Sequence, residues 1–334
     1  MKFLSFFISR LGKALTVVLG VVILNFFMIR LAPGDPAAVL AGQAGAGDPA
    51  YLAALRAEFG LDKPLLTQLG LYLKGVLQLD LGYSYRNHVP VLDLILERLP
   101  ATFLLMFCAF VFSIVFGVLL GVIAAKARYN NKRRWIDSSV MTGALLLYAT
   151  PLFWLSLMGI LLFSVLLGWL PAFGMETVGA GYTGWARVQD ISLHLILPTV
   201  TLGCFFMAVY VRLTRASMLE VIGMDFVKTA RAKGVSPNRV IRTHVLRNAL
   251  LPVVTFAGIQ LGQMAGGAVL TETVFAWPGI GRLMFDALLQ RDYQLLLGIF
   301  LVTSVMVVAF NLLTDLLYRL IDPRISADSQ GAAA

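Results

Sequence analysis

Charged side chains are scarce in this 334-residue chain: they make up 13% of the sequence, whereas 59% of its residues are hydrophobic. Soluble globular proteins carry about 25% charged and roughly 45–50% apolar residues. The balance excludes an ordinary soluble enzyme, a disordered chain and a nucleic-acid-binding protein with a solvated basic face. The two cysteines, Cys108 and Cys204, lie in apolar runs, so neither predicts half of a structural disulfide.

Motifs of catalysis and nucleotide binding are also missing. The phosphate-binding pattern Gly-x4-Gly-Lys-Ser/Thr does not occur, since Gly12-Lys13 is followed by Ala14. There is no Gly-x-Ser-x-Gly and no His–Glu metal motif, and His194 is a lone histidine without a second ligand. We therefore expect no catalytic site, no metal site and no cofactor in this chain.

Long uncharged runs are what the sequence does contain. A bilayer core about 30 Å thick is crossed by about 20 apolar helical residues. The uncharged stretch 138–175 includes Pro151 and Pro171, and we interpret it as one helix over roughly 140–167 with an interfacial tail. The first span could instead be a signal peptide, but it lacks an obvious cleavage site, so we expect a retained anchor. The six expected spans are 14–29, 101–125, 140–167, 191–211, 248–271 and 293–314.

Basic residues gather in alternate loops, which predicts the orientation in the membrane. Loop 126–135 contains five Lys or Arg and segment 212–251 contains eight. Segment 32–100 instead has five basic against seven acidic residues. The positive-inside rule therefore predicts that both termini are cytoplasmic, and the net charge of +9 reflects this bias.

The expected outside segment 32–100 has signals of local structure. Asp48-Pro49 is typical of a helix start and Gly60 of its end. The apolar spacing from Leu65 to Leu77 predicts a second, amphipathic helix. Such a cap is either a stabilising lid or a docking surface for something outside.

The basic segment 212–251 contains a short helix between sharp stops. Asp225 is a candidate N-cap, and Gly234 a candidate end, for a helix over 226–233. Ser236-Pro237 then begins a second helix. Small residues at alternate positions permit close approach of a partner, and the basic ones can pair with acidic groups on a partner or with lipid headgroups. The plainer interpretation is a basic surface helix.

This segment resembles the cytoplasmic loop of binding-protein-dependent ABC importer permeases. Thr229-Ala-Arg-Ala-Lys-Gly234 and His244-Val-Leu-Arg-Asn-Ala-Leu-Leu-Pro252 are similar to the loop of dipeptide, oligopeptide and nickel permeases, especially the first of their two permease subunits. The general motif of ABC importers begins with a glutamate at the position of Lys228. The role of that glutamate is therefore not assigned to Lys228. Other matching strings, in the family's order, are Leu31-Ala-Pro-Gly-Asp-Pro36, Gly60-Leu-Asp-Lys-Pro64, Asp80-Leu-Gly-Tyr-Ser84, Leu99-Pro-Ala-Thr102, Thr271-Glu-Thr-Val-Phe-Ala-Trp-Pro-Gly-Ile-Gly281, Arg291-Asp-Tyr293 and Asp322-Pro-Arg324.

The resemblance implies an all-α membrane protein with six transmembrane helices and the MetI-like core of type I ABC importer permeases. It implies an N-terminal helix with a periplasmic loop (1–100), a five-helix core (101–320) and a short tail (321–334). The short helix would dock on a cytoplasmic ATPase subunit and couple ATP hydrolysis to transport. The candidate coupling residues are Asp225, Phe226, Val227, Lys228, Thr229, Ala230, Arg231, Ala232, Lys233 and Gly234.

The resemblance also implies partners. They are a second homologous permease, two ATP-binding subunits that hold ATP and Mg, and a periplasmic or lipid-anchored substrate-binding protein. The chain would lie in the bacterial inner membrane and bind no nucleic acid. Peptides are the expected cargo, with glutathione and nickel or another metal chelate as alternatives. A channel would need no ATPase, which the coupling string argues against, and a membrane enzyme would need a nucleophile with a positioned base.

Small and polar residues of the fifth expected span are candidates for the transport pathway or for helix packing. Glycines recur there every four residues, a spacing that Gly117 and Gly121 repeat in the second span. Glutamines inside an apolar span must find partners. A glutamate near the outer end could attract a peptide amino terminus or form a local salt bridge. The candidates are Gly258, Gln260, Gly262, Gln263, Gly266 and Glu272.

Overall fold

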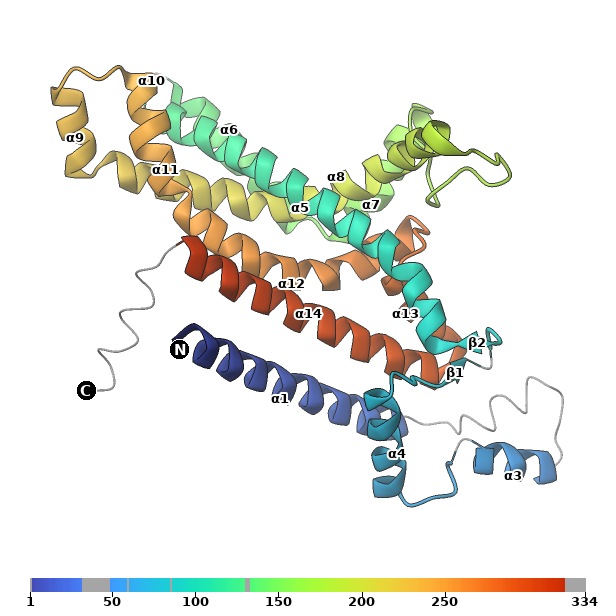
Figure 1. Ribbon diagram of the computed structural model, residues 1–334. Coiled ribbons are helices and arrows are strands. Elements are labelled where there is room, and N and C mark those ends of the chain that lie inside the picture. Colours follow the sequence, from blue (N-terminus) through green and yellow to red (C-terminus); the bar gives the residue numbers. More distant parts are fainter. Residues whose placement is uncertain (1, 32–48, 59, 85, 130–132, 322–334) are drawn as a thin grey trace. The chain divides into compact units, whose positions relative to one another are not determined.

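A computed structural model describes residues 2–31, 49–58, 60–84, 86–129 and 133–321 of the chain (Figure 1). These residues form helices, apart from the connections between them, of which 167–183 is a long loop, and one small hairpin. They divide into two compact units, which are described separately. One comprises residues 1–102 and 278–309, and the other 103–277 and 310–334.

The first unit combines the N-terminal helix with the segment predicted outside. Both helices expected in that segment are confirmed, as α3 and α4, whereas the hairpin and α13 were not predicted. The unit also takes in the first turns of the longer helix α5 and residues 293–309 of α14. Its elements are α1 (Lys2–Leu31), α3 (Pro49–Glu58), α4 (Leu65–Leu77), β1 (Tyr83–Ser84), β2 (Val89–Pro90), the start of α5 (Val91–Tyr129), α13 (Ile280–Gln290) and the start of α14 (Tyr293–Ile321).

Helix α1 buries only a narrow stripe. Ala14, Val22 and Phe26 are buried, and the Phe26 ring stacks on Tyr72 of α4 with 5.7 Å between ring centres. Most other side chains between Arg10 and Met28 are exposed or half-buried, as expected of a span that mostly meets lipid. Large exposed side chains on it include Leu15, Leu24 and Met28.

The hairpin is clamped to the junction of α13 and α14. The buried Ser84 hydroxyl donates to Asp292 Oδ2 (2.5 Å), and Gln294 Nε2 donates to the Leu81 carbonyl (3.1 Å). The strings Asp80–Ser84 and Arg291–Tyr293, which are distant in the chain, are therefore in contact in this unit. Helices α14 and α5 pack closely beside the hairpin, since a Cβ added at Gly298 of α14 would collide with Val91 of α5.

The second unit contains most of the long apolar helices. It comprises the rest of α5, α6 (Arg134–Ala149), α7 (Leu152–Gly159), the π-helical η2 (Ile160–Leu166), α8 (Gly184–Ile222), α9 (Asp225–Ala232), α10 (Pro237–Arg239), the π-helical η3 (Val240–Val245), α11 (Leu246–Ala249), α12 (Leu251–Val274) and the end of α14.

Glycines bring α5 and α8 into close contact. A Cβ added at Gly121 would lie 2.6 Å from Cβ of Thr214, and one at Gly117 would collide with Tyr210. In the reverse direction, α5 covers Gly203 of α8. Absent side chains let helix backbones approach in this way. The glycine spacing of the second predicted span therefore serves close packing within the chain.

The third expected span is not one helix, so that prediction was wrong. Helix α6 ends at Ala149 and α7 begins at Leu152, with a bend of 104° between α6 and the α7–η2 segment. Thr150 between them is extended (φ −79°, ψ 128°) and precedes Pro151. Proline lacks the N–H that would continue the helix and disfavours helical backbone in the residue before it, which explains the break.

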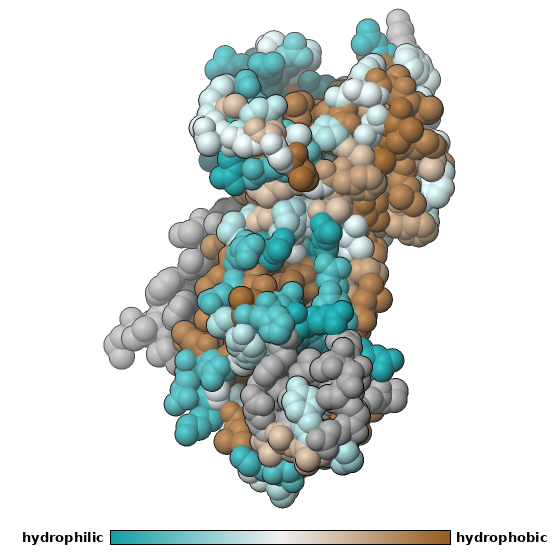
Figure 2. Space-filling model, turned by 90° about the vertical axis from the view of Figure 1, so that its right-hand side faces the viewer, coloured by the Kyte–Doolittle hydropathy of each residue, from teal (hydrophilic) through white to brown (hydrophobic). Residues whose placement is uncertain are grey.

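Four described helical segments are long and apolar enough to cross a membrane, and the number rises to six if each of two bent helix pairs is one span. The four are Arg10–Met28, Val91–Tyr129, Gly184–Ile222 and Tyr293–Thr314. Apolar side chains cover a large part of the surface on view in Figure 2 (brown). Such a surface suits a lipid environment rather than water.

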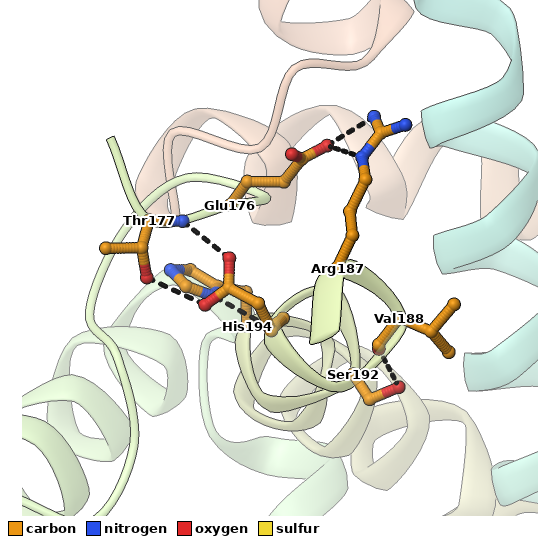
Figure 3. Close-up of polar contacts among 7 residues, drawn as sticks. Glu176, Thr177, Arg187, Val188, Ser192 and His194 are labelled. Atoms are coloured by element: carbon orange, nitrogen blue, oxygen red, sulfur yellow. Dashed lines mark hydrogen bonds and ion pairs between the residues drawn. The ribbon is translucent and has the colours of Figure 1, made fainter. Parts of the chain in front are cut away.

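The loop between η2 and α8 is fixed to the start of α8 by two polar contacts (Figure 3). Arg187 Nη2 lies 2.6 Å from Glu176 Oε1, and the Thr177 backbone N–H donates to Asp190 Oδ2 at 2.7 Å. The hydrogen bond from Arg187 lowers the pKa of the Glu176 carboxyl below its ordinary value. His194 Nδ1 lies 2.8 Å from the Asp190 carbonyl oxygen.

Candidate functional site

The short helix predicted in the basic segment is present as α9, displaced by one residue. Met224 has extended backbone (φ −70°, ψ 151°) and precedes the first helical residue, Asp225. The prediction of Asp225 as N-cap was wrong, because Met224 already turns the chain out of α8. The Asp225 carboxylate instead accepts a hydrogen bond from Lys228 Nζ, one turn along the helix, at 2.8 Å.

The glycine predicted to stop this helix is confirmed, although the last helical residue is Ala232 rather than Lys233. Gly234 has a left-handed φ of +78°, which glycine adopts without steric cost. Its N–H donates to the Arg231 carbonyl at 2.9 Å, and the next N–H reaches the Ala230 carbonyl at 3.3 Å. Ser236 then precedes α10 as its N-cap, with Pro237 as the first helical residue. A short, sharply bounded helix results (Figure 1).

Helix α9 has one buried and one open face. Val227 is fully buried and Ala230 is 8% exposed, whereas Phe226 is 42% exposed. The buried pair packs into an apolar cluster with the ends of α5 and α8 and with η3 and α11. Its other buried members are Ala125, Met218, Val221, Ile222, Val240, Val245 and Ala249.

The open face of α9 carries charge and one aromatic ring. The side chains of Asp225 and Lys228 are 94% and 67% exposed, and Ala232 and Lys233 are also exposed. This face presents an apolar ring among mostly basic groups on a helix that the chain's own core holds from behind. Such an arrangement can insert into a groove of another protein that has an apolar floor and acidic walls.

An ion pair that sequence reasoning missed joins α6 to α8 in the same unit. Arg215 donates through both arms to Asp137, from Nε to Oδ1 at 2.5 Å and from Nη2 to Oδ2 at 2.7 Å. The side chains are 23% and 6% exposed. The signal in the sequence was an aspartate three residues after a run of basic residues, but its partner lies 78 residues away.

The candidates on α12 separate into two groups. Gln260 and Glu272 are buried, at 1% and 0% exposure, and a Cβ added at Gly258 would collide with Thr314 of α14. Gln260 Oε1 has no hydrogen-bond partner among the described residues. These three therefore belong to the packed side of α12.

The other group lies on the open side of α12. Gln263 is exposed, and a Cβ added at the exposed Gly266 would meet nothing within 4 Å. Gly262 is half-buried at the border between the two sides. Ile259 and Leu270 extend the same open stripe, at 47% and 50% exposure. The structure thus leaves an amide side chain uncovered in the middle of an apolar helix.

Comparison with known families decides the assignment. Residues 117–327 match the family described as "Binding-protein-dependent transport system inner membrane component", and residues 3–106 match the family of its N-terminal part. The chain belongs to this transport family. Its permeases include relatives that match this chain along nearly the whole length.

Two such relatives are dipeptide transport system permease protein DppB of Escherichia coli (strain K12) and di/tripeptide transport system permease protein DppB of Pseudomonas aeruginosa (strain UCBPP-PA14). They are 40% and 42% identical to this chain, and each alignment covers 96% of it and 98% of the relative. A putative peptide transport system permease of Brucella abortus (strain 2308) is 41% identical.

The fold of this family member is also found among solved structures. A chain of the MetNI methionine ABC transporter, crystallised in an inward-facing conformation, aligns with a TM-score of 0.56 and 19% identity. The match covers 69% of this chain and 96% of that chain. At this identity the likeness concerns the fold alone, and it confirms the predicted MetI-like helical permease core.

Proposed function

We propose that this family member is one permease subunit of an ATP-driven importer that moves di- or oligopeptides across the bacterial inner membrane by alternating access. The observation that carries the proposal is α9, a short helix held on the chain's own core by Val227 and Ala230, with its opposite face open. The names of the relatives at 40% and 42% identity support peptides as the cargo.

Coupling to ATP then runs through the open face of α9. Phe226 and Lys228 on that face enter a groove of a cytoplasmic ATPase subunit, where ATP and Mg are bound. Closure of two such subunits moves α9 of this chain and its counterpart in a second, homologous permease. In this arrangement the chain crosses the membrane six times with both termini in the cytoplasm, supported by the distribution of basic residues.

The open stripe of α12 is this chain's contribution to the transport pathway. An exposed glutamine in the middle of a span is unfavourable against hydrocarbon, so Gln263 faces the second permease or a water-filled path. Its amide can both donate to and accept from a peptide backbone. Gly266 beside it leaves room for a peptide side chain. The buried Gln260, Gly258 and Glu272 hold α12 in place.

Substrate-stimulated ATP hydrolysis tests the proposal. Both permeases, both ATPase subunits and the substrate-binding protein are reconstituted in nanodiscs, and dipeptides, tripeptides, longer peptides, glutathione and nickel are compared. Stimulation by short peptides is expected. Stimulation by nickel or glutathione alone would keep the architecture and overturn the peptide assignment. Peptide flux into liposomes without ATP would indicate a channel instead.

Membrane orientation is tested independently with a cysteine at the exposed Lys63, in a chain whose two native cysteines are replaced by alanine. A membrane-impermeant maleimide added outside intact spheroplasts should label it. Labelling only after the membrane is opened would reverse the orientation.

A further inference from the structure

Besides its apolar contacts, one polar side-chain contact ties α9 to a neighbouring helix in the described part of the chain. Arg231 Nη1 donates a hydrogen bond to Tyr129 Oη at 2.5 Å, and the guanidinium carbon lies 4.8 Å from the centre of the tyrosine ring. Tyr129 is the last residue of α5. The other polar side-chain contacts of α9 in the described part of the chain stay within it, from Lys228 and Thr229 to Asp225.

The apolar contacts of α9 fix which face of the helix is buried, but not its position along the cluster. Val227 and Ala230 are its buried side chains, and rotation of the helix would expose them. Apolar burial is non-directional, so these contacts oppose sliding of the helix along the cluster only weakly. A hydrogen bond combined with a guanidinium stacked on a ring depends strongly on angle and position. The link from Arg231 to Tyr129 therefore adds a directional tie between α9 and the end of α5.

We propose that Tyr129 is a positioning residue for energy coupling: through Arg231 it locks the short helix to α5, so that displacement of α9 moves α5. This inference rests on the proposed function, because it assigns α9 to the ATPase. Helix α5 continues from Tyr129 through this unit without a break, and it is packed on α8 through Gly117 and Gly121. A displacement at its end is thereby passed into the membrane-spanning helices.

The chain offers a matched control for the test. Arg212 of α8 lies with its guanidinium carbon 5.6 Å from the ring centre of Tyr148 of α6. This is the same kind of contact between an arginine and a tyrosine that is about half exposed, in the same unit, and it does not involve α9. The Tyr148 ring also stacks on Phe205, with 5.5 Å between ring centres. Replacing Tyr148 therefore removes at least as many ring contacts as replacing Tyr129 does, which makes it a stringent control.

The experiment compares Tyr129→Leu, Tyr129→Phe and Tyr148→Leu in the complete reconstituted importer. Three quantities are measured: peptides imported per ATP hydrolysed, basal ATP hydrolysis, and ATPase subunits that co-purify with the permeases. Tyr129→Leu should lower the peptide-to-ATP ratio about two- to fivefold, the factor that corresponds to an exposed cation–π contact, with assembly and basal hydrolysis unchanged. Tyr129→Phe keeps the ring and should lose less, and Tyr148→Leu should leave the ratio intact.

A double variant shows whether Tyr129 acts through Arg231 or whether the two residues act independently. If Tyr129 acts through Arg231, Tyr129→Leu with Arg231→Leu should be no worse than the stronger single variant. Additive losses, or loss of ATPase subunits with Arg231→Leu alone, would make Arg231 a direct docking residue and overturn the inference. A normal ratio in Tyr129→Leu, or an equal loss in Tyr148→Leu, would overturn it too. Absence of peptide stimulation in the wild-type complex would refute the proposed function itself.

Discussion

Replacing Asp137 by asparagine should destabilise the second unit measurably. The substitution removes the charge that holds α6 to α8 through both arms of Arg215. Breaking a fully buried ion pair costs roughly 3–5 kcal/mol, whereas an exposed pair is worth about 0–1 kcal/mol. With side chains 6% and 23% exposed, this pair lies between the two cases. We expect a loss of about 2 kcal/mol in the free energy of unfolding.

Thermal unfolding of the purified subunit in detergent measures this loss. For a domain of 150–250 residues, 1 kcal/mol corresponds to roughly 2–4 °C in Tm. Asp137→Asn should therefore lower the apparent Tm by about 4–8 °C. All variants are heated at one fixed rate, because membrane proteins unfold irreversibly and the apparent Tm then depends on that rate.

Two further variants decide whether the ion pair is the cause. Glu97→Gln removes a carboxylate that is 67% exposed and 3.7 Å from Arg98, and it should change Tm by no more than the exposed-pair value allows. Asp137→Leu combined with Arg215→Met removes both charges and should recover most of the loss. An Asp137→Asn protein that melts with the wild type, or shifts no more than Glu97→Gln, would refute the reasoning.

Three other outcomes follow from the structure. Ala230→Glu puts a carboxylate on the buried side of α9 and should prevent accumulation of folded subunit on immunoblots. Ala232→Glu lies on the exposed side, so it should leave folding intact but reduce the amount of ATPase recovered in pull-downs. Equal behaviour of the two variants in both assays would contradict the two-faced helix. Gly121→Leu should lower the free energy of unfolding by at least about 1–3 kcal/mol, because the added side chain overpacks the contact with α8. Gly143→Ala has open space around its Cβ and should raise the free energy of unfolding by about 0.5–1 kcal/mol. The unfolding temperature of each variant gives the sign of its effect. Because the folded-state pKa of Glu176 is lowered, its ion pair contributes above the ordinary carboxyl value of about 4.3 and is lost as pH falls through the lowered value. Hydrogen exchange in the loop should therefore accelerate only below about pH 4.3. Glu176→Gln should weaken this pH dependence without abolishing it, because hydrogen bonds from Thr177 lower the pKa of Asp190 in the same contact region.

The sequence predicted α9 well because its end depends on local signals. Gly234 has the positive φ that stops a helix, and Ser236-Pro237 can begin another wherever they occur. Its beginning was misplaced by one residue, since the choice between Met224 and Asp225 as N-cap depends on how the chain leaves α8. A local pattern does not contain that information.

The third span shows a different limit. An uncharged run reports how apolar a segment is, but not whether it is straight, and proline is tolerated in many membrane helices. The extended Thr150 before Pro151 decided in favour of a break. In the same way, charged residues beyond the apolar run did not end α5, which continues to Tyr129.

Contacts between distant residues were out of reach of sequence patterns. Ser84 and Asp292 are 208 residues apart in the chain, and Tyr129 and Arg231 are 102 apart. Each member alone is an ordinary polar residue at the end of an element. Only the packing of the helices shows that these residues bind each other.

The thin packing of α1 has a consequence for how freely its sequence can vary. Only 11% of its most apolar stretch, within Arg10–Met28, is buried, and the buried side is the stripe of Ala14, Val22 and Phe26. A substitution scan of Arg10–Met28 should tolerate exchange of one aliphatic residue for another at most positions, with intolerance recurring at the three residues of the stripe. The helix could then be exchanged for an unrelated apolar segment that keeps those three residues in register, which makes it a practical place to graft a reporter or an affinity handle.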